Sequence, residues 1–311
     1  MSRLATLSFV VSLSALTVGA CADNAAPPAP PTAAERPELA QTYDVATATL
    51  EDETELSLEA LRNPEVPAPL PGTLGTRPEQ AEAVVHDVVF GADSRARVTP
   101  TDTFPAVARV RLALEFSDGY TSAGSGAMIG NKYVLTAGHV VYSHAHNGWA
   151  TKITAYPGQD GVLTPFTATA TKLRSVTGWT SDENNDYDYG LITLSSNLGN
   201  LTGTYGLASF SDDTLDTTTA YIYGYPGDKP WGTQWGSSGP IEDYDSTMLY
   251  YDIDTAGRMS GSGVYRWYDG TRYVFGVHTG DGYFWAVHYN TATRINTARF
   301  NQIVAWMATG T

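Results

Sequence analysis

Three side chains that could turn a serine into a nucleophile occur in order along this sequence of 311 residues. His139 ends the run Thr-Ala-Gly-His, Asp188 begins Asp-Tyr-Gly-Leu, and Ser260 begins Ser-Gly-Ser-Gly. In such a set the imidazole removes the hydroxyl proton, while the carboxylate fixes the tautomer of the imidazole and stabilises the imidazolium. Each run alone is a weak signal, but the three together indicate nucleophilic catalysis.

Two of these roles have a second candidate. Asp186 belongs to a polar run, whereas Asp188 directly precedes the apolar stretch 191–194. A strand there would hold Asp188 rigid and partly desolvated, so Asp188 is the better candidate and Asp186 is expected in a surface turn. Ser262 competes with Ser260, and the residue types alone do not decide between them.

The elements that must position these groups are predicted to be strands. From about residue 88, short runs of β-branched and aromatic residues alternate with clusters of Gly, Asp, Asn and Ser. This pattern is typical of an all-β domain, built as two packed barrels or a sandwich. The clearest predicted strands are 106–112, 133–136, 191–194, 220–223 and 273–277. Residues 291–307 repeat their apolar side chains at helical spacing, which predicts a C-terminal helix on the β-core.

The first 87 residues have a different composition. Residues 1–22 carry one positive charge, a short apolar stretch and small residues at the end, which predicts a secretory signal peptide. Residues 23–87 hold thirteen acidic residues against three arginines, with many prolines, which predicts an acidic pro-segment or a spacer with one helix over 45–62. The single cysteine, Cys21, would leave with the signal peptide or carry a lipid, so we expect no disulfide.

Charge and histidine spacing argue against two other classes of function. The formal net charge is −15, and no basic stretch forms a footprint for nucleic acid. His144 and His146 form a His-x-His pair that could be one edge of a metal site, but no third ligand is evident. We therefore expect no metal and no organic cofactor, and both histidines in a solvated loop.

Two further runs carry a family resemblance. They are Gly-Ser-Gly-Ala-Met-Ile-Gly at 124–130 and Asp-Thr-Ala-Gly-Arg-Met-Ser-Gly-Ser at 254–262. With them, residues 88–311 resemble the secreted glutamyl endopeptidases, bacterial Glu-specific serine proteases of the chymotrypsin clan. The resemblance implies two six-stranded antiparallel β-barrels and a trypsin-like active site between them, with His and Asp from the first barrel and Ser from the second.

The resemblance also assigns roles to single residues. In the family pattern the nucleophile is followed by Gly-Ser, which selects Ser260 over Ser262, and the pattern agrees with His139 as general base and Asp188 as its partner. The backbone N–H groups of Ser260 and Arg258 would form the oxyanion hole. The family has glycine at the position of Arg258, where a positive φ would cost another residue about 1 kcal/mol or more.

The same resemblance places Thr255 and His278 in the primary specificity pocket. A hydroxyl and an imidazole can both donate to a substrate carboxylate, which needs such partners when it is buried. We therefore expect cleavage after Glu and, less readily, after Asp. Asp281 lies three residues beyond His278 and would repel an acidic side chain unless it points outward or pairs with His278.

These features together predict a secreted, extracellular serine endopeptidase made as a zymogen. It would be a monomer that acts on protein or peptide substrates, with no nucleic-acid partner and no stable membrane span. Its activity should fall in acid, because a protonated imidazole cannot act as a base. The alternative is a non-catalytic trypsin-like fold that serves as an extracellular binding module, with Arg258 as the mark of lost catalysis.

The run Val-Val-Phe-Gly at 88–91 resembles the mature N-terminus of that family. We therefore predict that an acid-directed cut after Asp87 releases the domain 88–311, made either by another protease or by the enzyme itself. N-terminal sequencing of the secreted protein should begin at Val88 for the wild type, whereas Ser260→Ala should stay uncut at this bond if the enzyme cuts itself. A Ser260→Ala protein processed at the same bond would rule out self-cutting.

Overall fold

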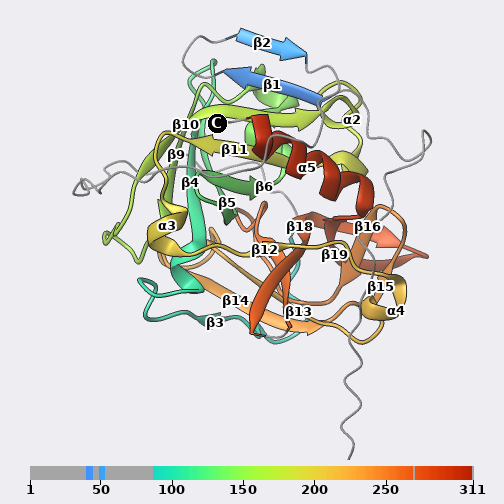
Figure 1. Ribbon diagram of the computed structural model, residues 1–311. Helices are drawn as coiled ribbons and strands as arrows, with labels where there is room; N and C mark the ends of the chain where they lie inside the picture. Colours follow the sequence, from blue (N-terminus) through green and yellow to red (C-terminus); the bar gives the residue numbers. More distant parts are fainter. Residues whose placement is uncertain (1–39, 45–48, 53–86, 269, 310–311) are drawn as a thin grey trace, which may run out of the picture. The chain divides into compact units, whose positions relative to one another are not determined.

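The strands predicted from the sequence form two large, mainly antiparallel sheets (Figure 1). This computed structural model describes residues 40–44, 49–52, 87–268 and 270–309, which all belong to one compact unit. The predicted signal peptide and most of the predicted pro-segment lie outside the described residues.

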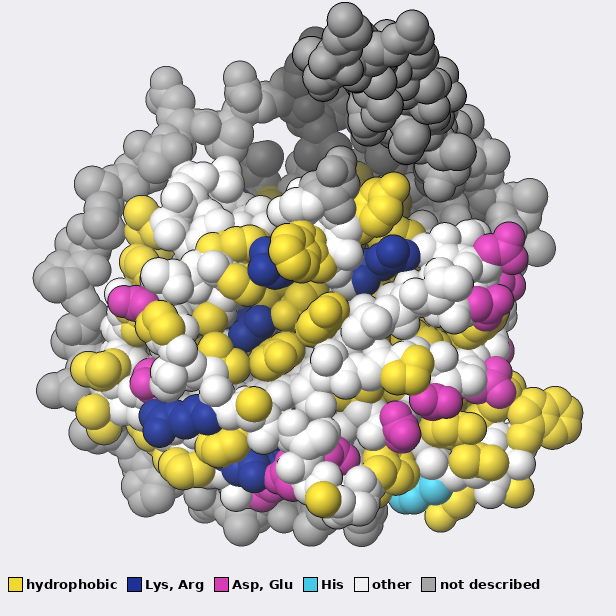
Figure 2. Space-filling model, turned by 90° about the horizontal axis from the view of Figure 1, so that it is seen from below, with side chains coloured by type: hydrophobic (Ala, Val, Ile, Leu, Met, Phe, Trp, Pro, Cys, Tyr) yellow, Lys and Arg dark blue, Asp and Glu magenta, His cyan; other side chains and the backbone are white. Residues whose placement is uncertain are grey.

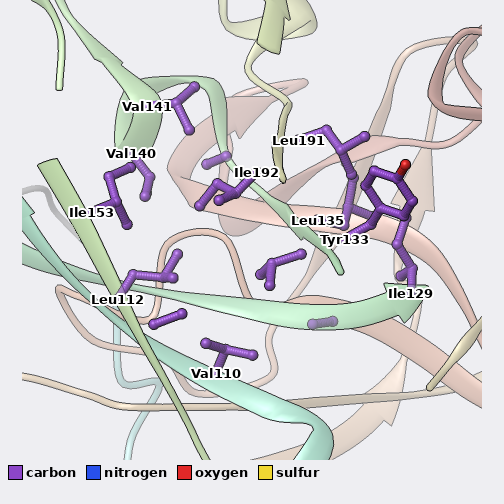
Figure 3. Close-up of a cluster of buried hydrophobic side chains, with 14 of the residues drawn as sticks. Val110, Leu112, Ile129, Tyr133, Leu135, Val140, Val141, Ile153, Leu191 and Ile192 are labelled. Carbon is purple, nitrogen blue, oxygen red and sulfur yellow. The ribbon is translucent and has the colours of Figure 1, made fainter. Parts of the chain in front are cut away.

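The first sheet closes into a six-stranded barrel. The strands follow the order β11-β6-β5-β4-β9-β10, and β10 pairs again with β11. Their bounds are β4 (Arg109–Glu115), β5 (Thr121–Gly130), β6 (Tyr133–Thr136), β9 (Lys152–Pro157), β10 (Ala168–Val176) and β11 (Gly190–Leu194). Aliphatic side chains such as Val110, Leu135 and Ile153 point into the barrel and are fully buried (Figure 3). This burial, worth about 1.5–3 kcal/mol for each side chain, stabilises the barrel.

Two strands from the predicted pro-segment extend this sheet. Strand β1 (Ala40–Asp44) pairs antiparallel with residues 172–176 of β10, and β2 (Thr49–Asp52) pairs with β1. The helix predicted over 45–62 is therefore wrong at Thr49–Asp52, because these residues pair as a strand. The remainder of 45–62 lies outside the described residues.

The second sheet has nine strands. The path runs β15-β16-β19-β18-β17-β13-β14-β3, and β12 lies parallel to β18. Their bounds are β3 (Ala96–Arg97), β12 (Gly206–Leu207), β13 (Thr219–Gly224), β14 (Trp235–Pro240), β15 (Asp243–Tyr244), β16 (Met248–Tyr251), β17 (Gly263–Tyr268), β18 (Thr271–Phe284) and β19 (Val287–Arg294). The expected all-β architecture is confirmed, with the first barrel closed, whereas the pairings among the described residues leave the second sheet open.

Short elements connect the strands. They are η2 (Ala106–Ala108), α1 (Gly138–Val141), β7 (Tyr142–Ser143), η3 (His144–His146), β8 (Gly148–Trp149), α2 (Thr177–Thr180), η4 (Asn185–Tyr187), α3 (Gly199–Thr202) and α4 (Asp212–Leu215). The strand predicted at 106–112 therefore begins only at Arg109, after the 3-10 turn η2. Among the described residues, no helix combines the length and apolar character needed to cross a bilayer.

The predicted C-terminal helix is present but starts later than expected. Helix α5 spans Thr297–Thr309, because residues 291–294 continue β19 and pair with β16 and β18. Ile303 and Trp306 of α5 are fully buried, and the Trp306 ring lies 5.6 Å from that of Tyr189, the neighbour of Asp188. The helix thus packs against the chain segment that carries the predicted catalytic carboxylate.

Loss of this packing should destabilise the protein. We predict that Trp306→Ala lowers the free energy of unfolding by about 3–5 kcal/mol, since a buried indole leaves a large cavity. Urea denaturation measures the change. Trp267→Ala is the matched control, because Trp267 is 60% exposed and its loss should cost under about 1 kcal/mol. Equal effects of the two substitutions would contradict the role of α5 in the core.

Candidate active site

The Asp188 carboxylate holds His139 at two points. Its Oδ1 accepts from the His139 backbone N–H at 2.8 Å, and its Oδ2 lies 2.7 Å from His139 Nδ1. His139 stands in the one-turn helix α1 directly after β6. Its neighbour Gly138 permits this approach, because a Cβ there would lie 3.0 Å from Asp188 Oδ1 and 2.8 Å from the Trp179 ring. The Nδ1–H therefore donates to the carboxylate, which leaves Nε2 as the basic atom.

Asp188 is itself fixed from the second sheet and from α5. It is 4% exposed, and its carbonyl accepts from the Thr293 hydroxyl of β19 at 3.1 Å. Arg299 of α5 donates to the carbonyls of Asp186, Thr247 and Arg294. Burial lowers the pKa of the Arg299 guanidinium. Asp186 lines the same cavity as His139, but its carboxylate accepts from the Thr247 hydroxyl at 3.2 Å, whereas Asp188 is the one paired with the His139 ring.

The loop that carries Ser260 is held by Ser125 of β5. The Ser125 N–H donates to the Ser260 carbonyl at 2.9 Å, and the Ser125 hydroxyl donates to the Arg258 carbonyl at 2.9 Å. Gly261 has φ +88°, and a Cβ there would lie 2.2 Å from the Ser125 carbonyl oxygen. Only glycine fits at this position. The Ser-Gly-Ser run therefore lies in tight contact with the first barrel.

Arg258 adopts the left-handed backbone expected at its position, with φ +76°. The preceding carbonyl, of Gly257, accepts from the Gly227 N–H at 2.8 Å. Because the carbonyl and N–H of a trans peptide point in opposite directions, the Arg258 N–H points away from Gly227. The arginine therefore occupies a glycine-like conformation rather than displacing the loop.

One cavity of about 680 Å³ brings together the predicted catalytic groups, whereas Thr255 and His278 are not among its lining residues. His139, Asp188, Ser260 and Arg258 all line it. Its walls come from both sheets, with Leu114, Phe116, Tyr120, Trp179, Met248, Tyr250, Thr279, Gly280, Asp281, Gly282, Tyr283 and Thr291 among them. Ser260 is 3% exposed, and its hydroxyl lies 3.5 Å from the Thr279 carbonyl.

Ser262 does not line this cavity. Its hydroxyl is buried without a hydrogen-bond partner among the described residues and lies 2.2 Å from where a Cβ of Gly224 would stand. The side chain therefore points into the interior. Of the two serines left open by the residue pattern, the geometry favours Ser260.

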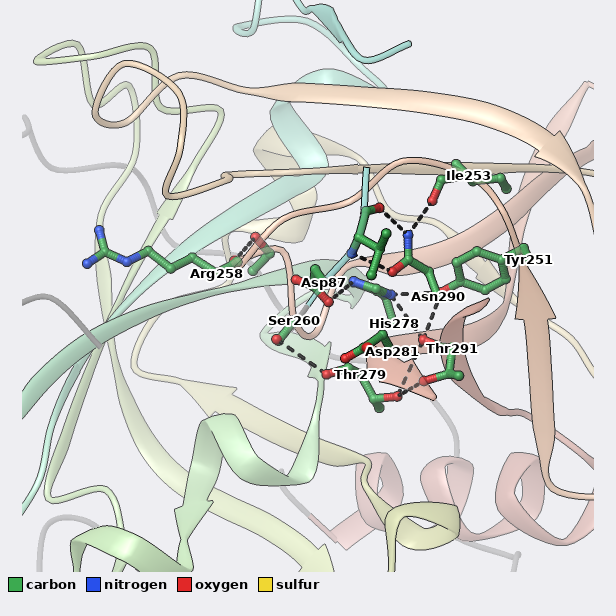
Figure 4. A network of polar contacts seen from close by, with 12 residues as sticks. Asp87, Tyr251, Ile253, Arg258, Ser260, His278, Thr279, Asp281, Asn290 and Thr291 are labelled. Carbon is green, nitrogen blue, oxygen red and sulfur yellow. Dashed lines mark hydrogen bonds and ion pairs between the residues drawn. The ribbon is translucent and has the colours of Figure 1, made fainter. Parts of the chain in front are cut away.

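The two predicted pocket residues, Thr255 and His278, are both fully buried (Figure 4 labels His278). His278 Nδ1 lies 2.7 Å from the Tyr251 hydroxyl and 3.0 Å from the Thr291 carbonyl. Burial, with a smaller contribution from Asp87, raises the pKa of Tyr251 well above its usual value. This hydroxyl therefore stays neutral, and it donates to the Thr291 carbonyl at 2.9 Å. The Thr255 hydroxyl has no hydrogen-bond partner among the described residues.

Other histidines and acids near the site have partners that the sequence did not reveal. Asp281 lines the cavity but pairs with His288 across β18 and β19 rather than with His278. His144 Nε2 lies 2.8 Å from the Trp179 carbonyl, while His146 stacks on Tyr120 and pairs with Asp118 at 3.0 Å. The described residues contain no group of three or more His, Cys, Asp or Glu side chains that could hold a metal ion.

The segment from Asp87 to Ser94 also reaches the site, which sequence reasoning missed. The side chain of Asn290 binds both the N–H and the carbonyl of Val88, at 2.9 and 2.7 Å. The Asp254 carboxylate accepts from the N–H groups of Phe90 and Ser94, at 2.7 and 2.6 Å. These contacts join residues more than 150 positions apart, so no local pattern could have indicated them.

A second cavity, of about 520 Å³, lies beside β3, β13 and β17. Aromatic rings and three arginines, Arg97, Arg109 and Arg272, line it, and none of its lining residues is a serine, histidine or acid. Figure 2 views the molecule from the side on which β3 and β14 lie in Figure 1, and basic side chains there lie among hydrophobic ones. This cavity therefore has no set of serine, histidine and carboxylate like the one in the first cavity.

Comparison with known proteins finds relatives that are named as proteases. The trypsin family model matches residues 100–252. The glutamyl endopeptidase of Bacillus licheniformis is 38% identical over 226 residues, which cover 70% of this chain and 68% of that protein. A Bacillus subtilis protein named extracellular metalloprotease is 37% identical over 221 residues, covering 70% and 69%. A solved structure of a Glu endopeptidase in complex with MPD matches with a TM-score of 0.62 and 28% identity, over 70% of this chain and 100% of that one.

The backbone at Arg258 leads to a stability prediction. Arg258→Gly should be about 1 kcal/mol more stable than Arg258→Ala, because alanine keeps a Cβ in the left-handed region and glycine does not. Both variants lose the same side-chain contacts, so their difference isolates the backbone strain. Urea denaturation of the two proteins measures it, and equal stabilities would show that the position is unstrained.

Proposed function

This chain belongs to the glutamyl endopeptidase family of trypsin-like serine proteases, and we propose that it cleaves peptide bonds after Glu, and less readily after Asp, through Ser260, His139 and Asp188. The observation that carries the proposal is the pairing of Asp188 with both the backbone and the ring of His139 beside Ser260 in one cavity. The Bacillus licheniformis relative is named a glutamyl endopeptidase, which supports cleavage after Glu.

The proposed reaction has two halves. Ser260 Oγ attacks the carbonyl carbon of the scissile bond while His139 Nε2 takes the hydroxyl proton. The negative charge on the substrate oxygen is stabilised by the N–H groups of Ser260 and Arg258. The tetrahedral intermediate then expels the amine, which takes the proton from His139, and an acyl-enzyme remains. In the second half, His139 removes a proton from water, which hydrolyses the ester and restores Ser260.

Asp188 serves the proton transfers without being protonated itself. Its contact with Nδ1 keeps the proton there, so Nε2 is left unprotonated to accept the serine proton, and its charge stabilises the imidazolium. The carboxylate is held in turn by Thr293 and Arg299 through the backbone of its own loop. Low pH should therefore abolish activity, because a protonated His139 cannot accept the serine proton.

The preference for acidic side chains rests on Thr255 and His278. Their hydroxyl and ring are fully buried, and a buried carboxylate requires donors of this kind. The pairing of Asp281 with His288 supports the preference, because the Asp281 carboxylate is engaged by His288 rather than by His278.

We further propose that residues 1–22 are a signal peptide, that 23–87 are a pro-segment, and that 88–311 form the secreted protease. The word extracellular in the name of the Bacillus subtilis relative supports secretion. The contacts of Val88 with Asn290 and of Phe90 with Asp254 support a domain that begins at Val88, because the segment is docked from that residue onward.

Digestion of a mixed peptide library by the processed protein tests this function. Cuts should follow Glu, then Asp, and Ser260→Ala should slow them by about 10⁴-fold or more. Ser262→Ala is the matched control, since its hydroxyl is outside the cavity, and it should keep its activity. Thr255→Val should lower kcat/KM for Glu substrates by about 10- to 100-fold, because the substrate carboxylate loses one hydrogen bond. A preference for basic or aromatic residues would overturn the pocket assignment.

A further inference from the structure

The Asp87 carboxylate lies against His278, one of the two residues predicted to form the specificity pocket. Its Oδ1 is 3.1 Å from His278 Nε2, and both side chains are fully buried (Figure 4). The distance is that of an ion pair, but neither carboxylate oxygen has a hydrogen-bond partner among the described residues. Burial of a carboxylate without hydrogen bonds is costly, so this side chain is held there by something other than its own contacts.

The neighbouring residue supplies that constraint. Val88 is bound on both sides of its backbone by the buried Asn290 side chain, and its carbonyl also accepts from the Thr255 N–H at 3.3 Å. With Val88 fixed at three points, the side chain one residue earlier has little freedom. Asp87 is thereby carried to the ring of His278.

The pocket offers the donor that a carboxylate needs. The ring nitrogen that faces Asp87 is His278 Nε2, which presents an N–H to the carboxylate when it carries a proton. On the other side of the ring, Nδ1 lies 3.0 Å from the Thr291 carbonyl, which also accepts from the Tyr251 hydroxyl at 2.9 Å. The Thr255 hydroxyl is buried in the same region without a partner among the described residues. These two groups are the ones that we propose to bind the acidic side chain of a substrate.

We propose that Asp87 is an internal substitute for that acidic side chain, so that its carboxylate blocks the specificity pocket of the uncut chain until the bond to Val88 is cut. This inference rests on the proposed function and adds to it the regulation of the same site. A substrate can bind only to chains whose pocket Asp87 has left. The apparent dissociation constant of the substrate therefore equals its intrinsic dissociation constant divided by the fraction of chains with an open pocket.

The cut releases the block through one hydrolysis. Water adds across the Asp87–Val88 peptide bond, so that the carbonyl carbon of Asp87 gains an oxygen and becomes a carboxylate. The Val88 nitrogen takes the protons and becomes an ammonium group that Asn290 Oδ1 can still accept from. Asp87 is then no longer tethered to Val88 and can leave the pocket.

Peptide binding to the uncut protein tests the block. All proteins carry Ser260→Ala, and intact mass confirms that the Asp87–Val88 bond is whole. The probes are a fluorescent hexapeptide with Glu before the scissile bond and its twin with Gln, measured by fluorescence anisotropy. Asp87→Ala should bind the Glu peptide about tenfold or more tightly than the parent. Asp102→Ala, at an exposed aspartate, is the matched control and should match the parent.

The outcomes separate this inference from the proposed function. Asp87→Asn keeps the side-chain shape and serves as a second variant, and circular dichroism verifies that both variants fold. If neither binds the Glu peptide more tightly than the parent, while the processed wild type still cuts after Glu, the block is refuted and the proposed function stands. If Asp87→Ala gains equal affinity for the Glu and Gln peptides, the block is supported and the preference for acid fails.

Discussion

Each of the two sheets holds the functional loop of the other through a hydroxyl group. Thr293 of the second sheet donates to the carbonyl of Asp188, which comes from the first barrel. Ser125 of the first barrel donates to the carbonyl of Arg258, next to Ser260. A shift between the sheets would break both bonds, and each buried group left unpaired costs about 1–3 kcal/mol. The serine and the histidine are therefore kept in one cavity by contacts outside it.

The candidate catalytic residues could be selected from the sequence because each lies in a short run with local constraints. Gly138 and Gly261 stand where any Cβ would clash. Such glycines make the two loops recognisable in the sequence alone. The contacts of Asp87 and Val88 could not be predicted, because Asn290 lies 202 residues from Val88 and its run has no distinctive composition. Long-range polar contacts of this kind leave no periodicity in the sequence.

Two of the errors in predicted secondary structure have a common cause. At 291–294 and at Thr49–Asp52, tertiary pairing with a neighbouring strand overrides a helical spacing of apolar side chains. Helical periodicity over a few residues is weak compared with the hydrogen bonds that a sheet offers. The pairing of Asp281 with His288 is a related case. It depends on the register between β18 and β19, and the sequence of either strand alone does not determine that register.

Strand β1 covers backbone groups of β10 at residues 172–176, yet it belongs to the part of the chain that a cut after Asp87 would detach. Loss of β1 would turn that stretch into a bare sheet edge, where N–H and carbonyl groups recruit strands from other molecules. The cut protein would then be more prone to aggregate than the precursor, in which β1 covers this edge of the sheet. The freed peptide would delay that change for as long as its own hydrogen bonds kept it on β10.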